Sequence, residues 1–148
     1  MADLRRFVAA QQPVYSQVLQ ELGAGRKQSH WMWFVFPQLR GLGQSHIAKH
    51  YALNSLDEAR DYMQHEVLGP RLVTCTRLVC DSSSATISTI FSYPDDLKFH
   101  SSMTLFYLAC REYAMAEIAD FEQALARYFD GHLDDQTMGL LALKNSLD

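Results

Sequence analysis

Residues 29–39 read Ser-His-Trp-Met-Trp-Phe-Val-Phe-Pro-Gln-Leu, and this stretch decides the fold class of the 148-residue chain. Its apolar part, residues 30–36, contains both tryptophans of the chain and is closed by Pro37. Hydrophobic periodicity does not separate a buried helix from a buried strand over so short a run. The neighbouring segments all show helical spacing and no second strand signal is present for pairing, so we predict a helix here.

Helical spacing continues on both sides of this stretch. Apolar residues recur three and four positions apart, as in Val14, Val18 and Leu22. Ser55 followed by Glu58 is typical of a capping box at a helix start. Residues 95–111 predict a long helix, and Asp134 or Asp135 is the expected cap of the last one. We therefore predict an all-α fold, a single compact domain over residues 1–148.

The spacing predicts about eight or nine short helices, for which an irregular α-α array is a candidate arrangement. The chain is 48% hydrophobic and 20% charged, which is typical of a globular domain and excludes a disordered tail. Its net charge of −4 argues against nucleic-acid binding. The first half is nevertheless slightly basic, which favours a small anionic ligand; the contributors are Arg26, Lys27, Arg40 and Lys49.

The sequence predicts a cytoplasmic location without membrane association. No apolar run approaches the roughly 20 residues that cross a bilayer, and the N-terminal residues show no leader pattern. Three cysteines are an odd number without framework spacing, so we expect free thiols in a reducing compartment. They are Cys75, Cys80 and Cys110.

A second unusual window, residues 94–106, reads Pro-Asp-Asp-Leu-Lys-Phe-His-Ser-Ser-Met-Thr-Leu-Phe. Together with residues 29–39, Gly41-Leu42-Gly43 and Tyr128-Phe129-Asp130-Gly131, it resembles the signature of the DUF1810 family of bacterial and fungal proteins. The resemblance covers about residues 4–141. It implies a mainly α-helical protein of uncharacterised function. Some members carry the label "calpastatin", a disordered inhibitor that this compact, aromatic-rich chain does not resemble.

The first window holds a histidine and two tryptophans that are candidates for a site. His30 has an ordinary pKa of about 6.5 and suits general acid–base catalysis, or it is a buried histidine with satisfied hydrogen bonds. Trp31 and Trp33 either stack on a ligand ring or belong to the core. Because they are two positions apart, they cannot face the same side of a helix, and we expect one of them to line a cavity.

Three polar residues flank these aromatic side chains. Gln38 offers paired donor and acceptor groups for an amide or a base edge, and Arg40 offers a fork for a phosphate or a carboxylate. The alternative is that both fix the loop through hydrogen bonds to the backbone. Ser29 precedes the apolar segment, where its hydroxyl either caps a helix or contacts a ligand.

The second window places polar residues at the start of the predicted long helix. Asp95 and Asp96 are stabilised there by the helix dipole and by unpaired N–H groups, which explains one aspartate but not both. Lys98, Ser101 and Ser102 follow, and helical side chains lean toward the N-terminus of their helix. We therefore predict a polar pocket at this helix start.

No metal site and no cofactor are predicted. His46 and His50 are four residues apart, which can place two imidazoles on one helix face. The metalloprotease pattern is missing, no further ligands are identifiable, and a solvated helix face is the favoured interpretation. The chain also lacks a phosphate-binding loop and a nucleophile elbow.

Two hypotheses follow for the function. The first is a protein that binds a nucleotide-like or ribosyl-like small molecule, or a hydrolase of such a molecule. In an N-glycoside cleavage, Asp95 or Asp96 would stabilise an oxocarbenium-like transition state while His30 protonates the leaving base. The alternative is a non-catalytic protein–protein interaction module with an unknown partner, anchored by Trp31, Trp33 and Arg40.

Overall fold

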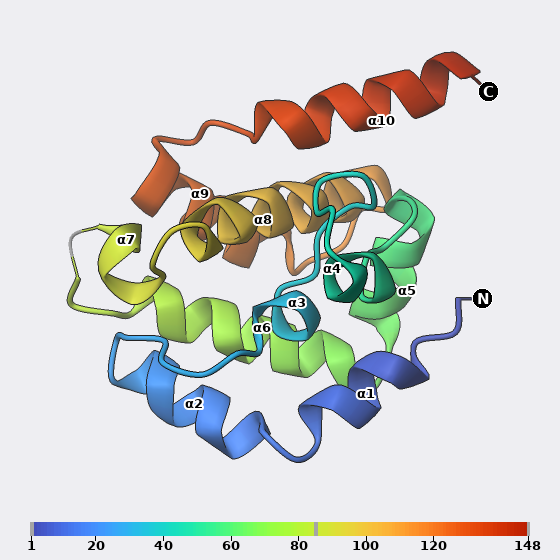
Figure 1. Cartoon of the computed structure of the whole chain (residues 1–148). Helices are drawn as coiled ribbons and strands as arrows, with labels where there is room; N and C mark the ends of the chain where they lie inside the picture. Colours follow the sequence, from blue (N-terminus) through green and yellow to red (C-terminus); the bar gives the residue numbers. More distant parts are fainter. Residues whose placement is uncertain (1, 85, 148) are drawn as a thin grey trace.

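The chain folds almost entirely into helices. The computed structural model describes residues 2–84 and 86–147, which contain ten helices, seven of them with seven or more residues (Figure 1). In chain order they are α1 (Arg5–Gln11), α2 (Tyr15–Gly23), α3 (Met32–Val35), α4 (His46–His50), α5 (Leu56–Gln64), α6 (Leu68–Cys80), α7 (Ile87–Ile90), α8 (Asp95–Glu112), α9 (Ile118–Phe129) and α10 (Asp135–Leu147). The all-α, single-domain prediction is confirmed, and the helix count lies close to the predicted one.

Helix α8 runs through the middle of the molecule, between α10 on one side and α6 on the other (Figure 1). It packs against α5, α7, α9 and α10. Ten of its residues are buried, so it is enclosed on most of its faces rather than on a single stripe. Its N-terminal half includes most of the predicted polar window, so the packing of α8 determines where those side chains point.

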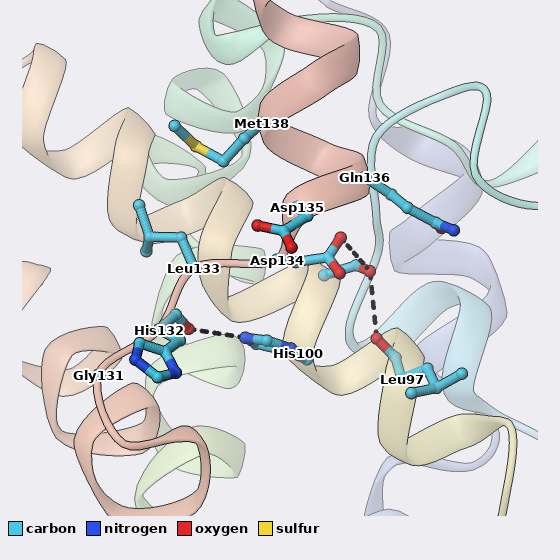
Figure 2. Close-up of a pocket in the computed structure, with 10 residues that line it drawn as sticks. Leu97, His100, Gly131, His132, Leu133, Asp134, Asp135, Gln136 and Met138 are labelled. Carbon is cyan, nitrogen blue, oxygen red and sulfur yellow. Dashed lines mark hydrogen bonds between the residues drawn. The ribbon is translucent and has the colours of Figure 1, made fainter.

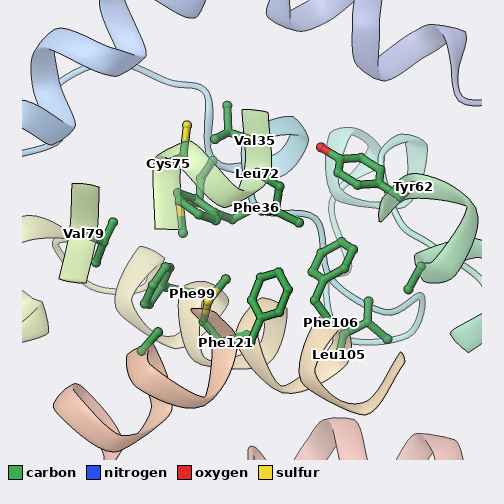
Figure 3. Close-up of a cluster of buried hydrophobic side chains, with 14 of the residues drawn as sticks. Val35, Phe36, Tyr62, Leu72, Cys75, Val79, Phe99, Leu105, Phe106 and Phe121 are labelled. Carbon is green, nitrogen blue, oxygen red and sulfur yellow. The ribbon is translucent and has the colours of Figure 1, made fainter. Parts of the chain in front are cut away.

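The core is built largely from aromatic rings contributed by segments far apart in the chain (Figure 3). Phe36 meets Phe99 of α8 edge-on, with ring centres 5.1 Å apart and an interplanar angle of 86°. Phe106 of the same helix stacks at 5.8 Å on Phe121 of α9. Such geometries follow the ring quadrupole and add to the gain from burial. The aromatic window is thus a core segment held against α8.

The helix predicted over residues 30–36 is confirmed but shorter, because α3 spans only Met32–Val35. Pro37 cannot donate a backbone hydrogen bond and disfavours a helical residue before it, so the chain leaves the helix there. The following segment forms an isolated parallel bridge between Leu39 and Leu53. No strand is present in the described parts of the chain.

Two helix starts agree with the capping predictions. The Ser55 hydroxyl accepts the Glu58 N–H at 3.2 Å, as a capping box requires, but the Glu58 carboxylate accepts the N–H of Asn54 rather than that of Ser55. Of the two candidates for the last helix, Asp134 is the cap, because its carboxylate accepts the N–H of Thr137 at 3.0 Å. Both signals lie within four residues of sequence, which is why they are readable without a structure.

All three cysteines are free and buried. Burial raises the pKa of Cys75 and Cys110 to about 12 and that of Cys80 to about 11, which makes these thiols poor nucleophiles. Among the described residues, none of the helices combines the length and the apolarity that crossing a bilayer requires.

Candidate functional site

The two polar and aromatic windows meet in space. The ammonium group of Lys98 lies 5.0 Å from the centre of the Trp33 ring, within the range of a cation–π interaction. Asp95, at the start of α8, forms an ion pair with Lys27, whose Nζ lies 2.9 Å from Oδ2. Residues about 65 positions apart in sequence are thus neighbours, because α8 packs across the aromatic segment.

These contacts form one group, which we name the tryptophan–lysine cluster: Trp31, Trp33, Lys27, Asp95 and Lys98. Lys27 also lies 5.1 Å from the Trp31 ring centre. Lys98 is the second partner of Asp95, at 3.6 Å. The side chain of Lys27 is only 9% exposed, whereas that of Lys98 is 22% exposed. Two ammonium groups share one carboxylate, so these contacts leave the cluster with one net positive charge.

The space between the windows is nearly closed. Trp33, Gln38, Tyr51 and Lys98 line a cavity of about 10 Å³ together with Phe36 and Ala48. That is about the least volume that holds one water molecule. The expected pocket is therefore present only as a seam between packed side chains, with Trp33 and Lys98 at its edge.

The two tryptophans face different ways, as the sequence predicts. Trp31 is 1% exposed, and its indole N–H donates to Oε1 of Glu21 at 2.9 Å. Trp33 is only half-buried and lies against Lys98. Of the two rings, Trp33 alone is accessible to a ligand.

Glu21 is a residue that sequence reasoning missed. It is 5% exposed, in α2, and it accepts hydrogen bonds from the Gln28 N–H, the Ser29 N–H and hydroxyl, the Trp31 indole and the Gln17 amide. Burial by itself raises the pKa of this carboxyl. The hydrogen bonds from Ser29, Gln28 and Gln17 outweigh that effect and hold the pKa at about 2. Ser29 therefore fixes the loop to α2, which is its observed contact.

His30 and Arg40 lie on the surface. His30 is exposed, and among the described residues no hydrogen bond or ion pair joins it to Asp95 or Asp96. The Arg40 guanidinium hydrogen-bonds the side-chain oxygen of Asn54, and its backbone N–H donates to Leu53. The Arg40 side chain thus links the loop to the side chain of Asn54 rather than to the backbone.

Three polar residues of the second window have different surroundings. The Asp96 carboxylate accepts the N–H of Leu97 at 2.9 Å, at the start of α8. The Ser101 hydroxyl donates toward Asp134 at 3.0 Å, on the side of α8 that faces α10. Ser102 is fully buried, and its hydroxyl is the buried side-chain polar group of the described residues that lacks a hydrogen-bond partner. The adjacent serines therefore do not form one pocket.

A larger groove lies on the α10 side of α8, with a volume of about 960 Å³ (Figure 2). Ser101 is the one predicted site residue that lines it. Of the other polar lining residues, His100 lies beside Ser101 in α8. The rest are more than 30 positions away, and no local sequence signal links them to α8; they are His132 and Asp134 of the α9–α10 connection and Asp135 and Gln136 of α10.

His46 and His50 are both exposed on α4. Among the described residues, no group of three side chains of the metal-ligand types is close enough to hold an ion.

These features define a small all-α domain with an aromatic seam over its central helix. The chain belongs to the DUF1810 family, whose model is described as "Protein of unknown function" and matches residues 1–141. It is similar to the conserved hypothetical protein Rv1873 from Mycobacterium tuberculosis, with 54% sequence identity and a TM-score of 0.89. That match covers 95% of this chain and 96% of the other. None of the curated proteins compared with the chain matches it.

Proposed function

We propose that this protein binds a small anionic molecule that carries a ring, of nucleotide-like or ribosyl-like type, at the tryptophan–lysine cluster. The observation that carries the proposal is the placement of the Lys98 ammonium 5.0 Å from the centre of the half-buried Trp33 ring. An aromatic face for stacking and a cation for a phosphate are the two groups that such a ligand requires.

The charges of the cluster support an anionic ligand. Lys27 is nearly buried and lies 2.9 Å from Asp95, so it neutralises most of that carboxylate. Lys98 is more exposed and lies 3.6 Å from the same carboxylate, so its charge is only partly compensated. A phosphate approaching from solvent would therefore meet Lys98 first and complete the charge balance of the cluster.

The closed seam restricts how such a ligand binds. A cavity of about 10 Å³ admits a water molecule at most, so the ring would stack on the exposed edge of Trp33 rather than enter the seam. Ser102 lies one turn beyond Lys98 on the same face of α8, and its hydroxyl lacks a partner. A buried water molecule would satisfy this hydroxyl, whereas a ligand stacked outside the seam would not reach it.

We propose that the protein binds this ligand without catalysing a reaction. Catalysis by His30 and an aspartate requires both groups at one reacting bond. Here Asp95 is engaged by two ammonium groups, Asp96 accepts the N–H of Leu97, and His30 is exposed. The interaction-module alternative loses one of its three anchors, because Trp31 is buried against Glu21.

Thermal unfolding with AMP, ribose 5-phosphate, ADP-ribose and adenosine tests the proposal. A ligand at 100 times its dissociation constant stabilises the folded state by about 2.7 kcal/mol, which is a shift of several degrees for a chain of this size. We expect AMP or ADP-ribose to stabilise the protein more than adenosine, which lacks the charge.

The variant Lys98→Gln should abolish most of that stabilisation. The matched control is Arg111→Gln, which removes one positive charge from the same helix at an exposed position about 20 Å away. If both variants lost the same amount of ligand-induced stabilisation, net charge alone would explain the effect, and this would contradict a binding site at Lys98. The absence of any shift with all four compounds would favour the interaction-module alternative.

A further inference from the structure

The groove between α8 and α10 has the size and the lining of a binding site that is independent of the tryptophan–lysine cluster. Its volume of about 960 Å³ is that of a small-molecule site. Leu97 and Met138, on its two sides, are 54% and 38% exposed, which is unusual for large apolar side chains. Figure 2 shows the lining residues, which come from α8, from α10 and from the connection before α10.

One carboxylate of the groove is held rigidly from both helices. Oδ2 of Asp134 accepts the Ser101 hydroxyl at 3.0 Å, the Thr137 N–H at 3.0 Å and the Thr137 hydroxyl at 2.6 Å. The backbone N–H of Asp134 in turn donates to the Thr104 hydroxyl. All of the side-chain hydrogen bonds recorded for this carboxylate among the described residues go to Oδ2, so Oδ1 retains its capacity to accept from a ligand.

The imidazole of His100 is also fixed. Its Nε2 lies 2.7 Å from the backbone oxygen of His132, and its ring stacks on Phe129 with centres 3.9 Å apart. A carbonyl oxygen only accepts, so Nε2 donates this hydrogen bond. The groove therefore has two polar side chains, Asp134 and His100, that hydrogen bonds hold in place.

We propose that this groove binds a small organic amine in its ammonium form, with the carbon skeleton against Leu97 and Met138. The charged groups that line the groove are Asp134 and Asp135. At the start of α10, whose N–H groups would attract an anion, the Asp134 carboxylate already accepts the N–H of Thr137 and places a negative charge there. An ammonium group donates several hydrogen bonds and brings the opposite charge, which matches this lining.

Three probes of the same shape and different charge test the inference. Titrations with benzylamine, benzyl alcohol and benzoate at neutral pH are followed by the backbone amide signals of the ¹⁵N-labelled full chain. Benzylamine is expected to shift the signals of residues 131–136 in a saturable way and to bind at least fivefold more tightly than benzyl alcohol. Equal affinity for the alcohol, tighter binding of benzoate, or no shift in these residues would overturn the proposal.

A variant that removes one carboxylate tests whether benzylamine binds in this groove. Asp135→Asn removes a carboxylate that has no recorded hydrogen bond or ion pair among the described residues, so the variant should fold normally. It is expected to weaken benzylamine binding about two- to fivefold, the range for one partly exposed charge pair. Glu122→Gln, an exposed carboxylate on α9, is the matched control and should leave binding unchanged. Equal weakening in both variants would contradict a site in the groove.

Discussion

The buried carboxylate of Glu21 is expected to be one of the largest single polar contributions to stability in this domain. Five donors converge on it, including the hydroxyl of Ser29 and the indole of Trp31. Replacing it in Glu21→Gln keeps the size of the side chain but removes the charge. It also places an amide NH₂ against groups that are themselves donors, so some of those donors lose their acceptor.

The lowered pKa of Glu21 gives the size of the stability loss that we expect in this variant. Its lowering from 4.5 to about 2 corresponds to about 3 kcal/mol of folding free energy at pH 7. Because the pKa is lower in the folded state, this stability is present above pH 4.5 and is lost as the pH falls toward 2. We therefore expect Glu21→Gln to unfold about 3 kcal/mol more easily at pH 7.

Urea unfolding followed by tryptophan fluorescence measures this difference, and Trp31 is a reporter beside the perturbed carboxylate. The wild type should lose about 2 kcal/mol of the Glu21 contribution between pH 7 and pH 3, whereas the variant has no such carboxyl to protonate. The difference between the two proteins should shrink by that amount, while the effects of other carboxyls cancel in the comparison.

Glu122→Gln is the control, since this carboxylate is exposed on α9 and should change stability by less than about 0.5 kcal/mol. If Glu21→Gln lowers the free energy of unfolding at pH 7 by no more than this control does, the hydrogen bonds to Glu21 do not stabilise the fold. If the loss is the same at pH 7 and pH 3, the charge of Glu21 is not its source.

Three further substitutions test the packing and capping of the helices. Gly69→Ala would place a methyl group 2.1 Å from the backbone oxygen of Met63, so α5 and α6 must separate, and calorimetry should show a loss of about 2–3 kcal/mol. Ser102→Ala removes a buried hydroxyl without a recorded partner and should be neutral or stabilise by up to about 1 kcal/mol in urea unfolding; a clear loss would reveal a bound water. Asp134→Ala removes the cap of α10 and should cost about 1–2 kcal/mol, with faster amide hydrogen exchange in the first turn of that helix, and unchanged exchange there would contradict the capping role.

The helical class was predictable because its signals are local. The cap at Ser55 acts over three residues, and the start of α8 follows directly after Pro94. The short aromatic segment was the uncertain element. The helical character of its neighbours predicts a helix there, and Pro37 marks its end, whereas no signal in the sequence shows that it begins only at Met32.

The candidate site was predictable only in part. The sequence singled out the two windows that meet, and it required Trp31 and Trp33 to face different ways. Ser29 and Ser101 are candidates for contacting a ligand, and the sequence does not show that their hydrogen-bond partners within the protein are Glu21 and Asp134. Nothing in a run of residue types shows that a glutamate on an apolar helix face will accept four hydrogen bonds from the segment that follows the helix and a fifth from its own helix.

By itself, the sequence determined that this is an all-α domain with its aromatic and polar residues concentrated in two windows, because helix periodicity and capping depend on neighbours within one or two turns. Only the tertiary structure decided which side chains of those windows face one another. The direction of each residue on α8 depends on the helices packed around it, so Lys98 lies against Trp33 while Ser101 points toward α10. The seam and the groove on two sides of this helix are therefore products of packing.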